Sequence, residues 1–145
     1  MPKQVDFYIL ETSDETSRMK TVCRLAEKIQ RMEHNILVLT TDNEQSHMLD
    51  ALMWTFSQSS FLPHAVAGAL DQDRQQTPVL IHHQMLNNAP EVLINLKVDI
   101  PQSVGLKRVV EIINQDEQVK VSGRHKYRNY KNQNFAIKTH HISAK

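Results

Sequence analysis

Several residue types that define common functional classes are scarce in this chain. One cysteine, Cys23, stands among 145 residues, which excludes an internal disulfide and a thiolate zinc cluster. The three glycines, Gly68, Gly105 and Gly123, lie too far apart to build a glycine-rich phosphate loop. No apolar run approaches the roughly 18 residues of a membrane helix. These absences exclude disulfide-stabilised, membrane-spanning and most nucleotide-binding classes.

What remains is the composition of an ordinary globular protein. Hydrophobic residues make up 40% of the chain and charged residues 23%, close to the average for folded domains. The length suits one domain, 1–145, with a core of its own. The first residues lack the charged and apolar regions of a signal peptide. We therefore expect a single domain in the cytoplasm.

Charge is distributed unevenly along the chain. The formal net charge is +1, yet residues 118–145 contain seven lysines or arginines and no acidic residue. The other 117 residues carry 10 basic against 16 acidic groups. Such asymmetry favours an anionic partner for the C-terminal part, either nucleic acid or an acidic peptide.

Apolar patterning predicts alternating strands and helices. β-branched runs indicate buried strands, and apolar residues at helical intervals indicate amphipathic helices. The predicted strands are 5–10, 36–40, 78–82, 92–96 and 108–113, although a helix is an alternative for the last, and the predicted helices are 12–33, 41–56 and 116–131. Residues 54–77 are predicted to form a long connection with room for a short strand. This order predicts a three-layer α/β domain with a mostly parallel sheet.

The usual catalytic and ligand motifs are missing from this framework. The turn 11–15, where many α/β folds bind phosphate, has no glycine or lysine and carries three carboxylates, so it disfavours nucleotides. Thr12 and Glu15 have the spacing of a capping box. The histidine pairs 82–83 and 140–141 lack chelating geometry, because neighbours in a strand point to opposite faces. Cys23, between apolar helix positions, is predicted to be buried and inert. We expect no metal, no cofactor and no catalytic residue.

The last helix carries the clearest functional signal. Lys120, Arg124, Arg128 and Lys131 are spaced by four, four and three residues, so their side chains form one cationic ridge, flanked by Tyr127. The inward face is predicted to consist of Val119, Gly123 and Tyr130, with the glycine allowing close packing. The ridge favours an anionic partner, and a merely solvated basic helix is the alternative.

Two aromatic residues form a second candidate surface. Trp54, the only tryptophan, and Phe61 lie where the second predicted helix gives way to the connection. Aromatic anchors are enriched at protein interfaces, although packing in the core explains them equally well.

Several segments together are similar to one protein family. They are FYIL, LDALMWTF, SFLPHAVAG, VLINL, RVVEIIN and GRHKYRNYKNQNF. In order and spacing they resemble the chi subunit of the bacterial DNA polymerase III holoenzyme, over nearly the whole chain. The resemblance implies a Rossmann-like fold without a phosphate loop. It also implies a noncatalytic accessory subunit of a DNA-directed DNA polymerase, a nucleotidyltransferase complex.

The resemblance further implies two partners. One is the acidic C-terminal tail of the single-stranded DNA-binding protein, with the matching positions Lys120, Arg124, Tyr127, Arg128 and Ile113. The other is the psi subunit of the clamp loader, matched by Trp54 and Phe61. DNA contact would then be indirect, no membrane would be involved, and the place of action would be the replisome. Direct binding of single-stranded nucleic acid is the alternative function, and a nucleotide hydrolase is a third.

Overall fold

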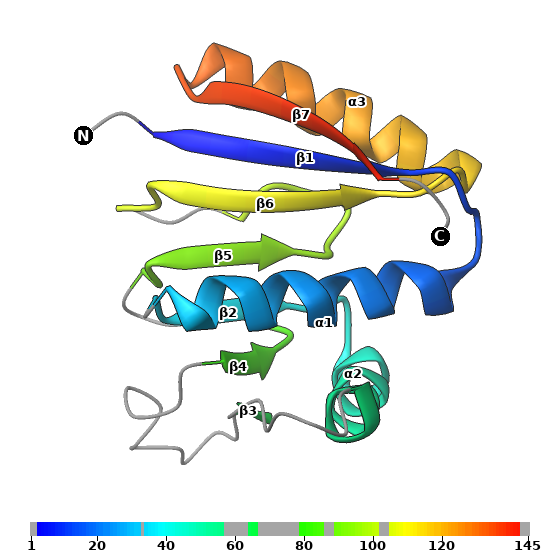
Figure 1. Cartoon of the computed structure of the whole chain (residues 1–145). Helices are drawn as coiled ribbons and strands as arrows, with labels where there is room; N and C mark the ends of the chain where they lie inside the picture. The colour runs from blue at the N-terminus through cyan, green and yellow to red at the C-terminus, as the bar shows by residue number, and fades with distance from the viewer. Residues whose placement is uncertain are drawn as a thin grey trace.

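The chain folds around one seven-stranded sheet (Figure 1). The structure is a computed structural model that describes residues 3–32, 34–56, 64–66, 79–85, 89–101 and 105–142. The strand order is β3-β4-β2-β5-β6-β1-β7, and every neighbouring pair is parallel. The predicted parallel α/β sheet is therefore confirmed.

Helices interrupt the strands as the sequence pattern indicates. The strands are β1 Gln4–Leu10, β2 Ile36–Leu39, β3 His64–Val66, β4 Val79–His82, β5 Val92–Asn95, β6 Arg108–Ile113 and β7 Ala136–Ile142. The helices are α1 Glu15–Arg31, α2 Asn43–Phe56 and α3 Glu117–Asn132. Of the two alternatives for 108–113, the strand is correct, and a short strand does interrupt the long connection.

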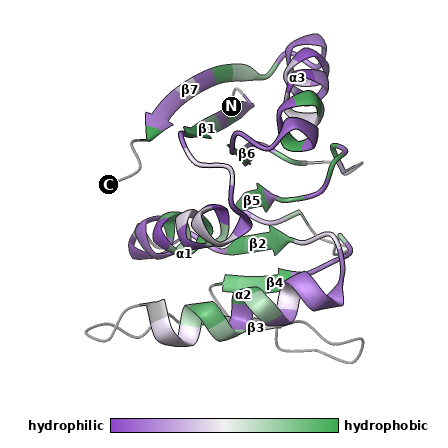
Figure 2. Ribbon diagram, turned by 90° about the vertical axis from the view of Figure 1, so that its right-hand side faces the viewer, coloured by the Kyte–Doolittle hydropathy of each residue, from purple (hydrophilic) through white to green (hydrophobic). Residues whose placement is uncertain are grey.

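The helices cover both faces of the sheet. α1 and α2 share one face, where Met19, Leu49 and Met53 pack with Val38 and other buried strand residues. α3 lies on the opposite face (Figure 2), where Tyr130 belongs to a second apolar cluster. Burial of one large apolar side chain, such as Leu49 or Met53, stabilises the fold by roughly 1.5–3 kcal/mol. The three-layer prediction is confirmed.

β7 is the element that the sequence pattern did not predict. It lies at the edge of the sheet beside β1, in parallel register from Gln4↔Ala136 to Leu10↔Ile142. Its side chains are exposed or half-buried, and none is fully buried. Lys138 and Thr139 are polar because an edge strand needs no continuous apolar run, so the run that marked the central strands is absent here.

The start of α1 differs in detail from the prediction. Asp14, rather than Thr12, caps the helix, and its Oδ2 accepts the Ser17 N–H at 2.8 Å. Glu15 instead lies 3.6 Å from the Arg18 guanidinium. The predicted capping box is wrong because the helix begins three residues beyond Thr12, whose carbonyl accepts the Gln115 N–H.

Two further outcomes concern single apolar positions. Cys23 is fully buried, as predicted. Met32 and Met48 stand at helical intervals from other apolar residues of α1 and α2, yet they are 57% and 44% exposed. No helix in the described ranges has the length and apolar character needed to cross a bilayer.

Candidate functional site

α3 lies against the strands β6 and β7, on the side of the sheet where β7 is the edge strand (Figure 1). Asp116 fixes its start, since Oδ2 accepts the Val119 N–H at 3.2 Å. Gly123 and Tyr130 are buried, and Val119 packs partly buried against the same apolar cluster. The inward face therefore consists of the three predicted residues, with one addition described below.

Gly123 sets the distance between α3 and β6. A Cβ at this position would lie 2.8 Å from Ile113 Cδ1 and 3.3 Å from its Cγ1, closer than van der Waals contact allows. Because glycine has no Cβ, the helix can approach β6 closely. The missing side chain also leaves room beside Ile113.

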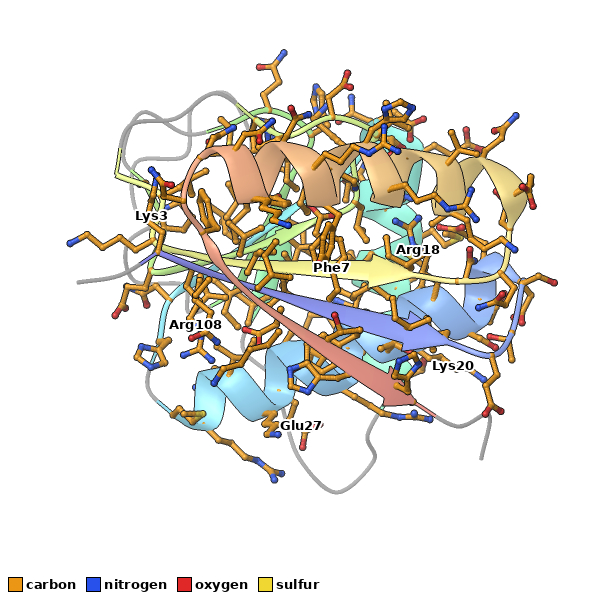
Figure 3. All side chains as sticks on the ribbon, turned by 90° about the horizontal axis from the view of Figure 1, so that it is seen from above. Lys3, Phe7, Arg18, Lys20, Glu27 and Arg108 are labelled. Carbon is orange, nitrogen blue, oxygen red and sulfur yellow. The ribbon has the colours of Figure 1, made fainter. Side chains whose placement is uncertain are left out.

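A pocket of about 420 Å³ opens at this place between α3 and the sheet. Its floor is apolar, with Phe7 and Ile9 from β1 beside Ile113 from β6. Figure 3 shows Phe7 on the side of β1 that faces α3. The pocket is lined by Phe7, Ile9, Ile113, Gln115, Lys120, Gly123, Arg124, Tyr127, Arg128 and Thr139.

The structure brings all five predicted tail-binding residues together at this pocket, namely Ile113, Lys120, Arg124, Tyr127 and Arg128. Ile113 is 5% exposed and belongs to the floor. Tyr127 is 42% exposed, and its ring lies 5.6 Å from that of Phe7 between centroids, tilted by 51°. Lys131, also on the predicted ridge, is not among the lining residues.

The rim of the pocket is positively charged. Lys120 Nζ lies 3.6 Å from Oε2 of the exposed Glu117, a long ion pair that offsets the positive charge of the lysine only weakly. Arg124 and Arg128 are exposed, and neither forms an ion pair with any residue that the structure describes. An apolar floor beneath unpaired guanidinium groups suits a ligand that carries both an apolar side chain and a carboxylate.

Lys126 is the residue of α3 that sequence reasoning missed. Only 3% exposed, it places Nζ 2.6 Å from Glu111 Oε1, and Glu111 is fully buried. The other carboxylate oxygen accepts the Tyr130 hydroxyl at 2.6 Å and the Asn95 amide at 2.9 Å. Lys126 also donates to the Lys97 carbonyl at 2.8 Å. This buried network fixes α3 to β5 and β6.

A signal for this network was present in the sequence. Glu111 interrupts the apolar run of 108–113, and a charge within a central strand needs a buried partner. Lys126 lies three residues after Gly123 and four before Tyr130, and so on the inward face of α3.

The second predicted surface lies on the other face of the sheet. Trp54, in the last turn of α2, is 59% exposed, so it is no core residue. Phe61 lies outside the described residues. Since α2 and α3 cover opposite faces (Figure 2), Trp54 and the basic pocket belong to separate surfaces.

The position where related folds bind phosphate is occupied by the chain's own groups. The Asp14 carboxylate caps α1 and accepts a backbone N–H that a phosphate would otherwise use. The Ser17 N–H holds the pKa of Asp14 below its usual value. Among the described residues no three His, Cys, Asp or Glu side chains gather in the manner of a metal site.

Solved structures with a similar fold include domains of DEAD-box proteins. The C-terminal domain of the DEAD-box protein Dbp5 aligns with a TM-score of 0.60 at 10% identity, covering 98% of this chain and 90% of that one. T4 UvsW aligns with a TM-score of 0.67 at 10% identity, covering 97% of this chain and 41% of that one. At such low identities the similarity concerns the fold alone.

Relatives that are similar in sequence point to one family, whereas the solved structures show only the fold. DNA polymerase III subunit chi of Pseudomonas aeruginosa is 29% identical, covering 96% of both chains. The subunit of Haemophilus influenzae is 26% identical, covering 98% of this chain and 99% of its own. That of Escherichia coli is 24% identical, covering 94% and 97%.

The sequence profile of one family covers almost the entire chain. The family described as DNA polymerase III chi subunit, HolC, matches residues 1–138, a range that contains β1 to β6, helices α1 to α3 and every lining residue of the basic pocket except Thr139. The chain therefore belongs to the DNA polymerase III chi subunits, accessory subunits of the bacterial replicative polymerase.

Proposed function

We propose that this accessory subunit is noncatalytic and links the clamp loader to DNA coated by the single-stranded DNA-binding protein. The basic pocket on α3 takes the acidic C-terminal tail of that protein, and a separate surface around Trp54 and Phe61 takes psi. Family membership supports the setting, a replisome in the cytoplasm, and the geometry of the pocket supports the tail as ligand.

The observation that carries the proposal is the apolar floor beneath a cationic rim. A tail that ends in an aromatic residue has an apolar side chain beside its terminal carboxylate. The side chain enters over Ile113 and Phe7, which line the floor. Arg124 on the rim pairs with the carboxylate, because a guanidinium offers two parallel N–H donors.

Other rim residues contribute in weaker ways. Lys120 and Arg128 attract the acidic residues that precede the tail's end, and the Tyr127 ring forms a side wall. Contacts between exposed charges are screened by salt. The complex is therefore weak and salt-sensitive, which suits a contact that must be released as replication advances.

A fluorescence-anisotropy titration tests the pocket. The probe is a short acidic peptide that ends in Pro-Phe with a free carboxylate, and its C-terminally amidated form is the control ligand. We expect Arg124→Ala to weaken binding at least tenfold, about 1.4 kcal/mol, and amidation to remove most of that difference. Arg24→Ala, an exposed arginine on α1, is the matched variant and leaves affinity unchanged.

The same titration separates the tail from nucleic acid. If equal affinity were measured for wild type and Arg124→Ala, the pocket would not be the tail site. If naked single-stranded DNA bound tightly at physiological salt and the peptide failed to displace it, the chain would be a direct nucleic-acid binder through its basic helix.

A further inference from the structure

We infer that the carboxyl-terminal edge of the sheet carries a third docking surface, which takes a basic protein segment with apolar side chains. Two adjoining hollows of about 650 and 390 Å³ lie there. They share Val98, Gln118 and Ser122 as lining residues, so they form one groove. The carboxyl edge of a parallel sheet is where open α/β folds place ligands.

α3 separates this groove from the basic pocket. Val119 and Ser122 line the groove, whereas Lys120 and Arg124 line the pocket. The groove reaches from α3 across the residues after β5 to the first turns of α1 and α2. Arg18, at the groove's inner side, lies near the carboxyl ends of β1 and β6 (Figure 3).

Apolar side chains stand exposed along the groove. Met48, Val98 and Val121 are 44%, 65% and 42% exposed. They are half of the six large hydrophobic residues that are exposed among the described ones, and all three line the two hollows. Exposed apolar side chains gathered within a polar rim mark interaction sites rather than random surface.

The most exposed of them is held in place. Val98 stands in a short turn whose backbone receives hydrogen bonds from side chains on two elements, α3 and β5. Ser122 Oγ donates to the Val98 carbonyl at 2.6 Å, and Lys126 Nζ donates to the Lys97 carbonyl at 2.8 Å. Asn95 donates to the Asp99 carbonyl at 3.1 Å. Val98 is thus presented rigidly, which lowers the ordering cost of binding.

The charge around the groove selects a basic occupant. Its two buried cations are neutralised, Lys126 by Glu111 and Arg18 by Glu15. Glu44 and Asp99 line the groove without an ion pair among the described residues. Asp42, Asp116 and Glu117 add further carboxylates, against Lys97 as the one accessible lysine or arginine of the described lining. Nucleic acid and acidic tails are therefore repelled, whereas Lys or Arg beside apolar residues fits both features.

The test uses methyl-labelled protein and NMR titration with four synthetic peptides of equal length. They contain Arg with Leu, Arg with Ser, Gln with Leu, and Glu with Leu. We expect only the Arg–Leu peptide to shift the methyl signals of Met48, Val98 and Val121 to saturation. Shifts confined to other methyls, or equal binding of the Arg–Ser peptide, would show that no apolar docking groove exists here.

Variants then assign the affinity to the groove. We expect Glu44→Gln with Asp99→Asn to weaken the Arg–Leu peptide about fivefold, and Val98→Thr to weaken it about threefold. The matched double variant, Glu27→Gln with Glu91→Gln, removes two carboxylates elsewhere and leaves binding unchanged. An equal loss of affinity in both double variants would show that only the net charge of the protein matters, and it would overturn the inference. The acidic Pro-Phe peptide, added in excess, does not compete, which keeps this result independent of the basic pocket.

Discussion

Lys126 Nζ and Glu111 Oε1 lie 2.6 Å apart with both side chains almost completely buried. The pair connects the middle of α3 to the middle of β6. The side of α3 at the basic pocket and the side at the groove are therefore both held in place by one buried ion pair.

The first prediction concerns this pair. Lys126→Met leaves a carboxylate buried without its cation, so we expect the free energy of unfolding to fall by about 3–5 kcal/mol, measured by urea denaturation. Combining it with Glu111→Gln restores part of that stability, because the Gln oxygen still accepts from Tyr130 and Asn95. If the double variant were less stable than either single variant, the ion pair would not be the source of the loss.

A second prediction concerns the space beside Gly123. In Gly123→Ala the new methyl meets Ile113 Cδ1 and narrows the pocket, while helix propensity favours alanine by about 1 kcal/mol. We expect stability to stay within about 1 kcal/mol of wild type and affinity for the acidic peptide to fall at least threefold, about 0.65 kcal/mol.

Two variants control that measurement. Adding Ile113→Val removes the Cδ1 atom that the methyl meets, and it recovers part of the affinity. Asn129→Ala, at an exposed position of α3, changes neither property. Unchanged peptide affinity in Gly123→Ala would place the ligand away from Ile113.

The third prediction distinguishes the surface around Trp54 from the basic pocket, which lies on the opposite face of the sheet. Trp54 is 59% exposed, so Trp54→Ala lowers the melting temperature only slightly, whereas a core tryptophan would cost about 3–5 kcal/mol. We expect the variant to weaken association with the clamp loader and to change acidic-peptide affinity less than twofold, about 0.4 kcal/mol. Joint loss of fold and both activities would identify Trp54 as a packing residue.

The fourth prediction concerns the single thiol. Burial raises the pKa of Cys23 to about 12, so the thiolate that reacts with disulfide reagents is nearly absent at pH 8. We expect almost no labelling of the native protein and one equivalent in denaturant. Because the pKa is raised in the folded state, Cys23 favours folding below the unfolded thiol's pKa and loses that contribution at higher pH. Fast labelling of native protein at pH 8 would contradict this burial.

The central strands and the cationic ridge were predictable because each produces a simple pattern in the sequence. The run 36–39 is buried on both faces of its strand, and Arg124 and Arg128 lie four residues apart on one side of a helix. β7 has no such pattern in the sequence, because an edge strand exposes polar side chains and needs no continuous apolar run. Met48 fits the apolar interval of α2 yet faces the groove, since only tertiary packing decides which part of a stripe is covered.

β1 is made first during synthesis, yet both of its neighbours are made late. Gln4 stands opposite Arg108 in β6 and Ala136 in β7, so its pairing closes loops of more than a hundred residues. At a synthesis rate of about 5–20 residues per second, β1 therefore lacks both neighbouring strands for several seconds after it has been made. Such non-local pairing predicts slow, late folding. During that interval its apolar residues are a natural substrate for chaperones.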